Sequence, residues 1–301
     1  MIRRGKENIM LNEKEFYCYV EHHILEYIKQ PEDKEVSVQR VCKNNQVFMT
    51  GLSIGTKEVH FRPVLYLEPY YHKYFRGSIL SDLLSEIAAS YEEYQVEFPL
   101  KEEKIRDYEF IKKQLFFRIV NYEKNKEQLQ ICPYDRMEDL AVTYRWSAYH
   151  RHDGMASAIV REQDLKMWGI TKEKLRTDAF KNAEKIFPPV IKRIENVIPV
   201  HVEEGDIPIF VLSNNDYMNG ASAMFYQGIL QEFAERMKEN LYILPSSIHE
   251  VILLRESDAG DVRELSYMVK ETNRAVVDPE EILSDSIYYY DRIRNKITIA
   301  R

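Results

Sequence analysis

The sequence predicts an α+β protein in which mixed or largely antiparallel sheets are flanked by amphipathic helices. Two observations lead to this class. Strand-like and helix-like segments are interleaved along the chain, and several neighbouring strand-like segments are joined by short turns. Short turns join antiparallel strands, whereas parallel strands need a crossover of about a dozen residues or more. The pattern therefore disfavours a doubly wound parallel sheet.

The first hundred residues predict a helix, a strand meander and a second helix. Asn12 and Glu15 have the spacing of a capping box, and the helix they begin ends before Pro31. Residues 36–67 are rich in β-branched and aromatic residues, interrupted by a polar Lys-Asn-Asn turn, as in a meander of strands. Gly77-Ser78 then begins a helix whose broad apolar stripe indicates packing on a sheet.

The charged run at 101–109 is the expected boundary between a smaller N-terminal unit, 1–100, and a larger C-terminal domain, 101–301. It is equally compatible with the exposed start of a helix. Residues 115–121 fit either a strand or the end of that helix. Residues 140–148 alternate with a period of two, which predicts a strand, and a His-rich turn leads from it into a second strand of a hairpin.

The rest of the chain continues the mixture of elements. A short helix ends at Gly169, Thr171 caps the next one, and Pro188-Pro189 ends that helix. Residues 207–254 predict a strand, an Asn/Gly loop, a long helix, a strand, a Pro-Ser-Ser turn and a strand. Two capped helices follow, one from Asp258 or Asp261 and one from Asp278, and 286–300 predicts a hairpin.

Composition narrows the class of protein. The chain has 301 residues, of which 45% are apolar, enough for a full core. A net charge of −7 argues against a nucleic-acid binder, which usually carries a basic face. Cys18, Cys42 and Cys132 are far apart and form no CxxC, which favours a reducing compartment over disulfides or zinc.

The sequence has no feature of secretion, membrane insertion or cofactor binding. No apolar run follows the basic residues near the N-terminus, and no stretch approaches the ~18–20 apolar residues of a membrane span. His150, His152 and Asp153 lack a third and fourth ligand at fixed spacing. We therefore expect a soluble cytoplasmic protein without a metal or cofactor.

Several strings together are familiar. They are CKNNQVFMTGLSI, FRPVLYLEPYYHKYFRG, FFRIVNYEKNKEQL, EDLAVTYRW, LKMWGITKEKL and YILPSSIHEVILL. In this combination, from about residue 36 to the C-terminus, the chain resembles a bacterial family of gut Firmicutes catalogued as domain of unknown function 5688. The resemblance implies a cytoplasmic bacterial protein. It implies no catalytic residue, cofactor or substrate.

The turn at 245–250 is one candidate site. Ser246 or Ser247 as nucleophile, His249 as base and a carboxylate such as Asp139 are the groups that acyl transfer requires. Glu250 adjoins His249, so in a strand their side chains would point to opposite faces. No Gly-flanked elbow exposes either serine. The same residues also fit a turn whose hydroxyls cap backbone groups.

The loop at 213–222 is a second candidate. Asn214, Gly220 and Ser222 lead from a strand into a helix, where backbone N–H groups can hold a phosphate or carboxylate. Neither GxGxxG nor GxxxxGK[ST] is present. The alternative is a structural loop with Asn and Gly in left-handed conformations.

A third candidate is an interaction surface formed by Tyr70, Tyr71, Tyr74 and Arg76, since aromatic rings beside cations can anchor a protein partner. The alternative is that these rings lie in the core while their hydroxyls reach water.

Because no catalytic motif is complete, the sequence favours a non-enzymatic protein-binding, ligand-binding or adaptor role. The alternative is an enzyme of hydrolase or phosphotransfer type that uses both polar segments. It requires the 213–222 loop and the 245–250 turn to open into one pocket, with a carboxylate within hydrogen-bond reach of His249.

Overall fold

The computed structural model describes residues 10–56, 62, 64–97, 102–151, 154–201, 203 and 205–300. The chain divides into two compact units. The first contains residues 1–43 and 48–102, and the second contains 44–47 and 103–301. The expected domains, 1–100 and 101–301, stay a prediction about which segments fold independently. In the part described, no helix has both the length and the apolar character of a membrane span.

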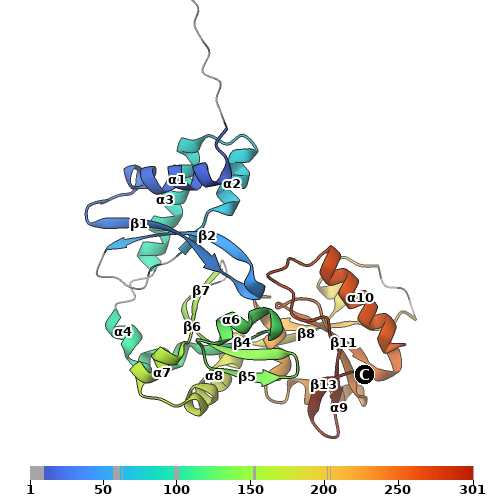
Figure 1. Cartoon of the computed structure of the whole chain (residues 1–301). Helices are drawn as coiled ribbons and strands as arrows, with labels where there is room; N and C mark the ends of the chain where they lie inside the picture. The colour runs from blue at the N-terminus through green and yellow to red at the C-terminus, as the bar shows by residue number, and fades with distance from the viewer. Residues whose placement is uncertain are drawn as a thin grey trace, which may run out of the picture. The chain divides into compact units, whose positions relative to one another are not determined.

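In the residues described, the first unit combines helices with an antiparallel sheet (Figure 1), and the order of its strands is β1-β2-β3. Its elements are α1 (Glu13–His23), β1 (Lys34–Cys42), β2 (Phe48–Thr56), β3 (Val64–Tyr66), α2 (Glu68–Phe75) and α3 (Leu80–Glu97). The predicted capping box at Asn12 and Glu15 is confirmed. Phe16 of α1, Ile54 of β2 and Ile87 of α3 are buried in one apolar core.

The second unit begins with a four-stranded antiparallel sheet. Its path is β4-β6-β5, and β7 also pairs with β6. The strands are β4 (Leu115–Asn121), β5 (Tyr134–Met137), β6 (Leu140–Arg151) and β7 (Gly154–Ile159), with helices α4 (Glu102–Arg106), α5 (Tyr108–Ile111), α6 (Lys126–Leu129), α7 (Glu162–Trp168) and α8 (Lys172–Ile186). Residues 115–121 are thus a strand rather than a helix end.

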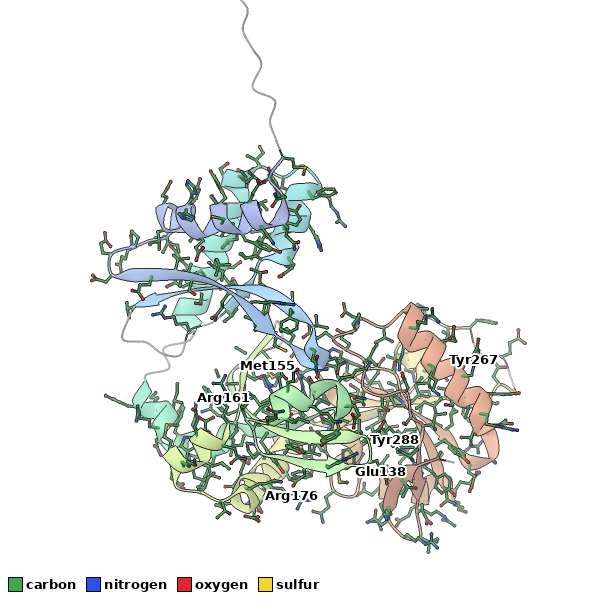
Figure 2. All side chains as sticks on the ribbon, viewed as in Figure 1. Glu138, Met155, Arg161, Arg176, Tyr267 and Tyr288 are labelled. Carbon is green, nitrogen blue, oxygen red and sulfur yellow. The ribbon has the colours of Figure 1, made fainter. Side chains whose placement is uncertain are left out.

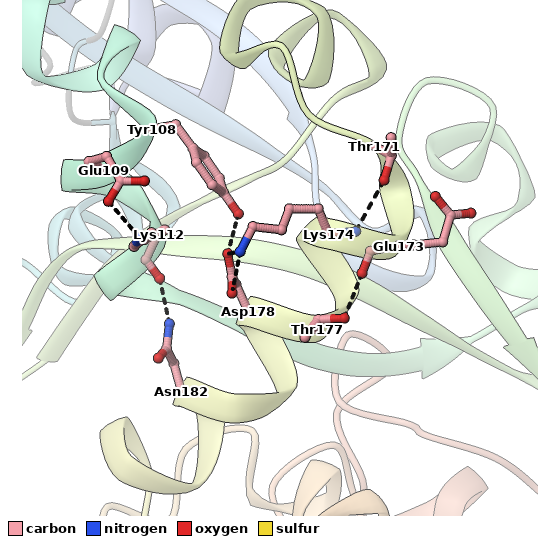
Figure 3. A network of polar contacts seen from close by, with 9 residues as sticks. All are labelled: Tyr108, Glu109, Lys112, Thr171, Glu173, Lys174, Thr177, Asp178 and Asn182. Carbon is pink, nitrogen blue, oxygen red and sulfur yellow. Dashed lines mark hydrogen bonds and ion pairs between the residues drawn. The ribbon is translucent and has the colours of Figure 1, made fainter.

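Helix α8 packs on β4, where the rings of Phe117 and Phe180 stack 4.1 Å apart. Polar contacts also hold α8 to α5 (Figure 3). The Tyr108 hydroxyl of α5 donates to the Asp178 carboxylate of α8 over 2.6 Å, and within α8 Lys174 pairs with the same carboxylate over 2.8 Å. At the ends of the neighbouring helices, Gly169 and Thr171 have the stop and cap roles that the sequence predicts.

The second unit also contains a six-stranded antiparallel sheet in the order β13-β12-β10-β11-β9-β8. Its strands are β8 (Pro189–Arg193), β9 (Phe210–Asn214), β10 (Leu241–Pro245), β11 (Val251–Arg255), β12 (Tyr288–Asp291) and β13 (Lys296–Ile299), with helices α9 (Ile229–Met237) and α10 (Val262–Ala275). Phe233 of α9 meets Phe210 on one face, and Val269 of α10 packs with Leu244 and Leu254 on the other.

The predicted α+β class with antiparallel sheets is therefore confirmed. The strand at 140–148, the hairpin at 286–300 and the order of elements in 207–254 are also as predicted. The long helix of that segment is shorter than expected, because left-handed Gly228 (φ +84°) separates a 3-10 helix, 220–225, from α9. Helix α2 and strands β5 and β8 are elements that the sequence did not predict.

The predicted helix from Asp278 is wrong. The carbonyls of residues 279–283, which would accept the first helical hydrogen bonds, have partners from distant segments. Asn45 donates to Pro279 and Ile282, Asn44 to Glu280, and Asn121 to Leu283. The Ile248 N–H donates to the Glu281 carbonyl. Because these tertiary bonds replace the i to i+4 ladder, the segment forms only a turn.

Candidate functional site

The two polar segments of 207–254 meet. The Ala221 N–H donates to the Ile248 carbonyl over 3.3 Å, and the Ser213 hydroxyl donates to the His249 carbonyl over 2.8 Å. Gly220 permits this approach, because a Cβ at that position would lie 2.5 Å from the His249 carbonyl oxygen. The two segments are therefore in direct contact through backbone and hydroxyl groups.

His249 lies between these segments and a third one. Its Nδ1 accepts the Asn219 N–H over 3.2 Å, so the neutral ring carries its proton on Nε2. Nε2 lies 3.2 Å from Oε1 of Glu281, to which it donates. Both ring nitrogens are therefore engaged, and neither is left to accept a proton from a hydroxyl nucleophile.

The two serines of the turn have structural partners. The Ser247 hydroxyl oxygen accepts the His249 N–H over 3.0 Å, and the Ser246 hydroxyl donates to the Glu250 carboxylate over 3.3 Å. Ser247 is buried. Neither hydroxyl contacts an imidazole nitrogen among the described interactions. The arrangement is that of a turn stabilised by its own side chains.

The expected anion cradle is already filled by internal acceptors. The Asn214 side chain accepts the N–H groups of Asp216 and Met218 and donates to the Met218 carbonyl. The N–H of Ser222 donates to the Asn219 carbonyl, and its hydroxyl accepts the Ile119 N–H over 3.2 Å. Asn214, Gly220 and Ser222 are all buried. The N–H groups of Asp216, Met218 and Ser222 are thus bound within the loop and are not free to bind a phosphate.

Asp139 has partners other than His249. Its two carboxylate oxygens accept the hydroxyls of Ser284 and Tyr288, each over 2.6 Å. The carboxylate within reach of His249 is instead Glu281. Sequence reasoning singled out Glu281 only as part of a helix cap after Asp278, so its role beside His249 was missed.

The tyrosines of the expected interaction surface pack against the core of the first unit. The rings of Tyr71 and Tyr74 lie 5.6 and 5.3 Å from that of Phe16, and the Tyr70 hydroxyl lies 3.2 Å from that of Ser90. Arg76 is exposed. The exposed aromatic ring of this helix is Phe75, at 66%.

No group of three or more His, Cys, Asp or Glu side chains in the described ranges is placed to hold a metal ion. His150 contacts Asp216 over 2.9 Å, while His152 and Asp153 lie outside those ranges. None of the three cysteines is in a disulfide.

A different feature of the second unit is the free edge of strand β8. The Asn215 N–H donates to the Pro188 carbonyl and the Ile194 N–H to the Ile209 carbonyl. Because antiparallel pairs alternate, Val190 and Lys192 also bond to β9, whereas Ile191 and Arg193 point their N–H and C=O groups away from it. These outward groups have no backbone partner in the structure as described.

A groove lined by both apolar and charged side chains runs beside this edge. Its volume is about 240 Å³, and it lies between β8 and α9. Its lining residues are Pro189, Ile191, Ile229, Glu232, Phe233 and Arg236. This volume is smaller than the ~300–1,000 Å³ of small-molecule pockets, and a side chain of an added strand is a better match. An unpaired edge beside a helix-lined groove is the geometry of peptide binding by strand addition.

Comparison with known proteins identifies one family, whose function is unknown. The model of a family of unknown function, DUF5688, matches residues 13–292. The chain therefore belongs to that family. No curated protein and no solved structure matches it.

Proposed function

We propose that this chain is a non-enzymatic binding protein of the bacterial cytoplasm, an adaptor that docks an extended segment of a protein partner on strand β8. The observation that carries the proposal is the outward-facing backbone of Ile191 and Arg193 beside the groove between β8 and α9. Main-chain bonds would supply affinity, and an apolar side chain in the groove would supply selectivity. A net charge of −7 favours a protein over a nucleic acid as partner.

Two further features favour docking of a selected partner over aggregation of this chain through the edge of β8. Strand β8 is short, and it carries Pro189, Lys192 and Arg193, residue types that limit aggregation at sheet edges. The missing N–H of Pro189 removes one donor from the edge. A partner strand would therefore have to place its backbone acceptors opposite the N–H groups of Ile191 and Arg193, which fixes its register on β8.

The second candidate is the hydrolase or phosphotransfer enzyme, favoured by the meeting of the two polar segments and by the Glu281 carboxylate beside His249. Against it stand the engaged nitrogens of His249 and the burial of Ser247. A phosphotransferase would also need free backbone donors at 216–222, where the N–H groups of six of the seven residues, all but Gly220, already have acceptors within the protein.

The test compares two variants at the outward edge. Peptides would be selected from a displayed random library against the full chain, and their affinities measured by calorimetry. Arg193→Pro removes the outward N–H without touching the ladder to β9, while Arg193→Ala keeps that N–H as the matched control. We expect Arg193→Pro to weaken binding by about tenfold, or about 1.4 kcal/mol, and Arg193→Ala to have little effect.

Bound peptide should also slow hydrogen exchange at the amides of Ile191 and Arg193. Equal affinity for both variants, or protection at other amides only, would contradict docking at β8. Labelling of Ser247 by a fluorophosphonate would favour the hydrolase instead.

A further inference from the structure

The opposite edge of the six-stranded sheet has a cavity of about 590 Å³. Two tyrosines, Tyr242 and Tyr289, line it together with two glutamates, Glu138 and Glu256, and with residues 298–300 at the end of β13. Among the residues that the structure describes, no lysine, arginine or histidine side chain lines it. In the described part of the chain, the lining of the cavity therefore combines aromatic rings with negative charge.

The aromatic wall of the cavity follows from strand register. Tyr242 of β10 and Tyr289 of β12 are direct partners, so their side chains lie on one face of the sheet. Their ring centroids are 5.2 Å apart with the planes at 63°. Thr298 of β13 is the partner of Tyr289 in the same row. Both rings are half-buried, so their remaining surface is available to a ligand.

Glu256 is held in a fixed position at this wall. Its Oε1 accepts the Tyr289 hydroxyl over 2.8 Å, and its Oε2 accepts the Asn240 amide over 2.9 Å. A carboxylate oxygen has more than one lone pair, so both oxygens keep the capacity to accept a further donor. Burial, and then the hydrogen bond to Glu256, raise the pKa of Tyr289 to about 12, so its hydroxyl stays protonated at neutral pH.

Two further acceptors lie at the same cavity. Glu138 is exposed, in the turn between β5 and β6, with a left-handed backbone (φ +56°). It adjoins Asp139, which binds Tyr288, and Figure 2 shows Glu138 and Tyr288 close together. The Ala300 N–H donates to the Ile287 carbonyl, so by alternation the carbonyl of Ile299 points to the open side of β13.

We propose that this cavity binds an organic ammonium ion that carries N–H donors. Carboxylates and a strand-edge carbonyl accept those donors, and tyrosine faces attract the cation. Two carboxylates would repel an anionic molecule, and a neutral molecule would lack the charge attraction that strengthens their hydrogen bonds. A bare divalent metal ion would need several carboxylates gathered within its coordination sphere, and in the described ranges no such group exists. This site is separate from the proposed peptide site on β8.

The probe is 1,5-diaminopentane, titrated by calorimetry into the full chain. Two comparison compounds separate its contributions: pentane-1,5-diol has no charge, and tetramethylammonium has no N–H donor. We expect the diamine to bind, tetramethylammonium to bind more weakly, and the diol not to bind.

Glu138→Gln removes one charge from an exposed side chain and should weaken diamine binding by about fivefold, equivalent to about 1 kcal/mol. Glu271→Gln, an exposed glutamate on α10, is the matched control and should bind as the parent does. Unchanged thermal unfolding would establish that both variants fold. Failure of the diamine to bind, equal binding of the diol, or equal loss in both variants would overturn the proposal.

Discussion

At the scale of single residues, Asp139 illustrates how a candidate catalytic group becomes a structural one. Its carboxylate accepts two hydroxyls, those of Ser284 and Tyr288, and both of these side chains are buried. A carboxylate bound in this way satisfies groups that would otherwise be costly to bury. The residue type is compatible with catalysis, but only its partners define what it does.

Replacing Tyr288 by Phe tests this assignment. The variant loses the hydroxyl and leaves one oxygen of Asp139 without its partner, so we expect unfolding to become easier by about 1–3 kcal/mol at pH 7. Tyr267→Phe, whose ring is 68% exposed on α10, is the control. Urea unfolding followed by circular dichroism measures both variants. A change below that of the control would refute the structural role of Asp139.

The burial of Tyr288 beside Asp139 predicts a pH dependence of stability. Burial, and then the negative charge of Asp139, raise the pKa of Tyr288 above its usual value of about 10. A group whose pKa is raised in the folded state stabilises fully below its unfolded pKa and loses this effect as pH rises above it. The parent chain should therefore lose stability above about pH 10, and the Tyr288→Phe variant should lose less over the same range.

At the scale of elements, the shape of the loop after β9 depends on two adjacent residues, Asn219 and Gly220, for different reasons. Asn219 has a left-handed backbone (φ +53°), a conformation in which Asn is tolerated. Gly220 is needed for a different reason, because the backbones of Asn214 and His249 approach it closely. The sequence marks both residues as loop formers without distinguishing these roles.

This difference gives a paired prediction. Gly220→Ala would place its Cβ 2.5 Å from the His249 carbonyl oxygen and 2.7 Å from the Asn214 nitrogen, so the loop must shift. We expect a cost of about 1–3 kcal/mol in unfolding free energy. Asn219→Gly relieves the left-handed backbone and should stay within about 0.5 kcal/mol of the parent. Equal effects of the two changes in urea unfolding would mean that the close approach is not what requires glycine.

At the scale of the whole molecule, the second unit depends on residues 44–47, which come from the turn between β1 and β2. Asn45 donates to the carbonyls of Pro279 and Ile282 and accepts the amide of Asn125. Its backbone N–H donates to Asn125 in return, over 2.9 Å. A fragment that begins at residue 101, where the expected C-terminal domain starts, would lack these partners.

Asn45→Gly in the full chain measures what this turn contributes. Glycine keeps the left-handed backbone (φ +56°) and the N–H, so the loss reports the side chain alone. Three side-chain hydrogen bonds disappear, and we expect about 2–3 kcal/mol less stability, with faster hydrogen exchange across 279–283. Asn215→Gly, at an exposed position, is the matched control. Unchanged exchange at 279–283 would contradict the prediction.

The amino-acid sequence by itself determined the family, the α+β class and the elements whose signals are local. The capping box at Asn12 and the left-handed stop at Gly169 depend on neighbours within a few residues, so they can be predicted locally. The strand at 140–148 shows its period of two in the sequence, and pairing with β4, β5 and β7 completes it. For Gly220, the sequence predicted only a position in a loop and not the close approach of the His249 and Asn214 backbones.

Tertiary structure decided the rest, because the partners lie far apart along the chain. Asn44 and Glu280, whose contact replaces the expected helix, are 236 residues apart. Strand β8 begins with Pro189, which predicts a break, and it forms because an edge strand needs hydrogen bonds on one side only. The role of His249 likewise depends on Asn219 and Glu281. They bind its two ring nitrogens only when the 213–222 loop, the 245–250 turn and the 279–283 segment come together in the fold.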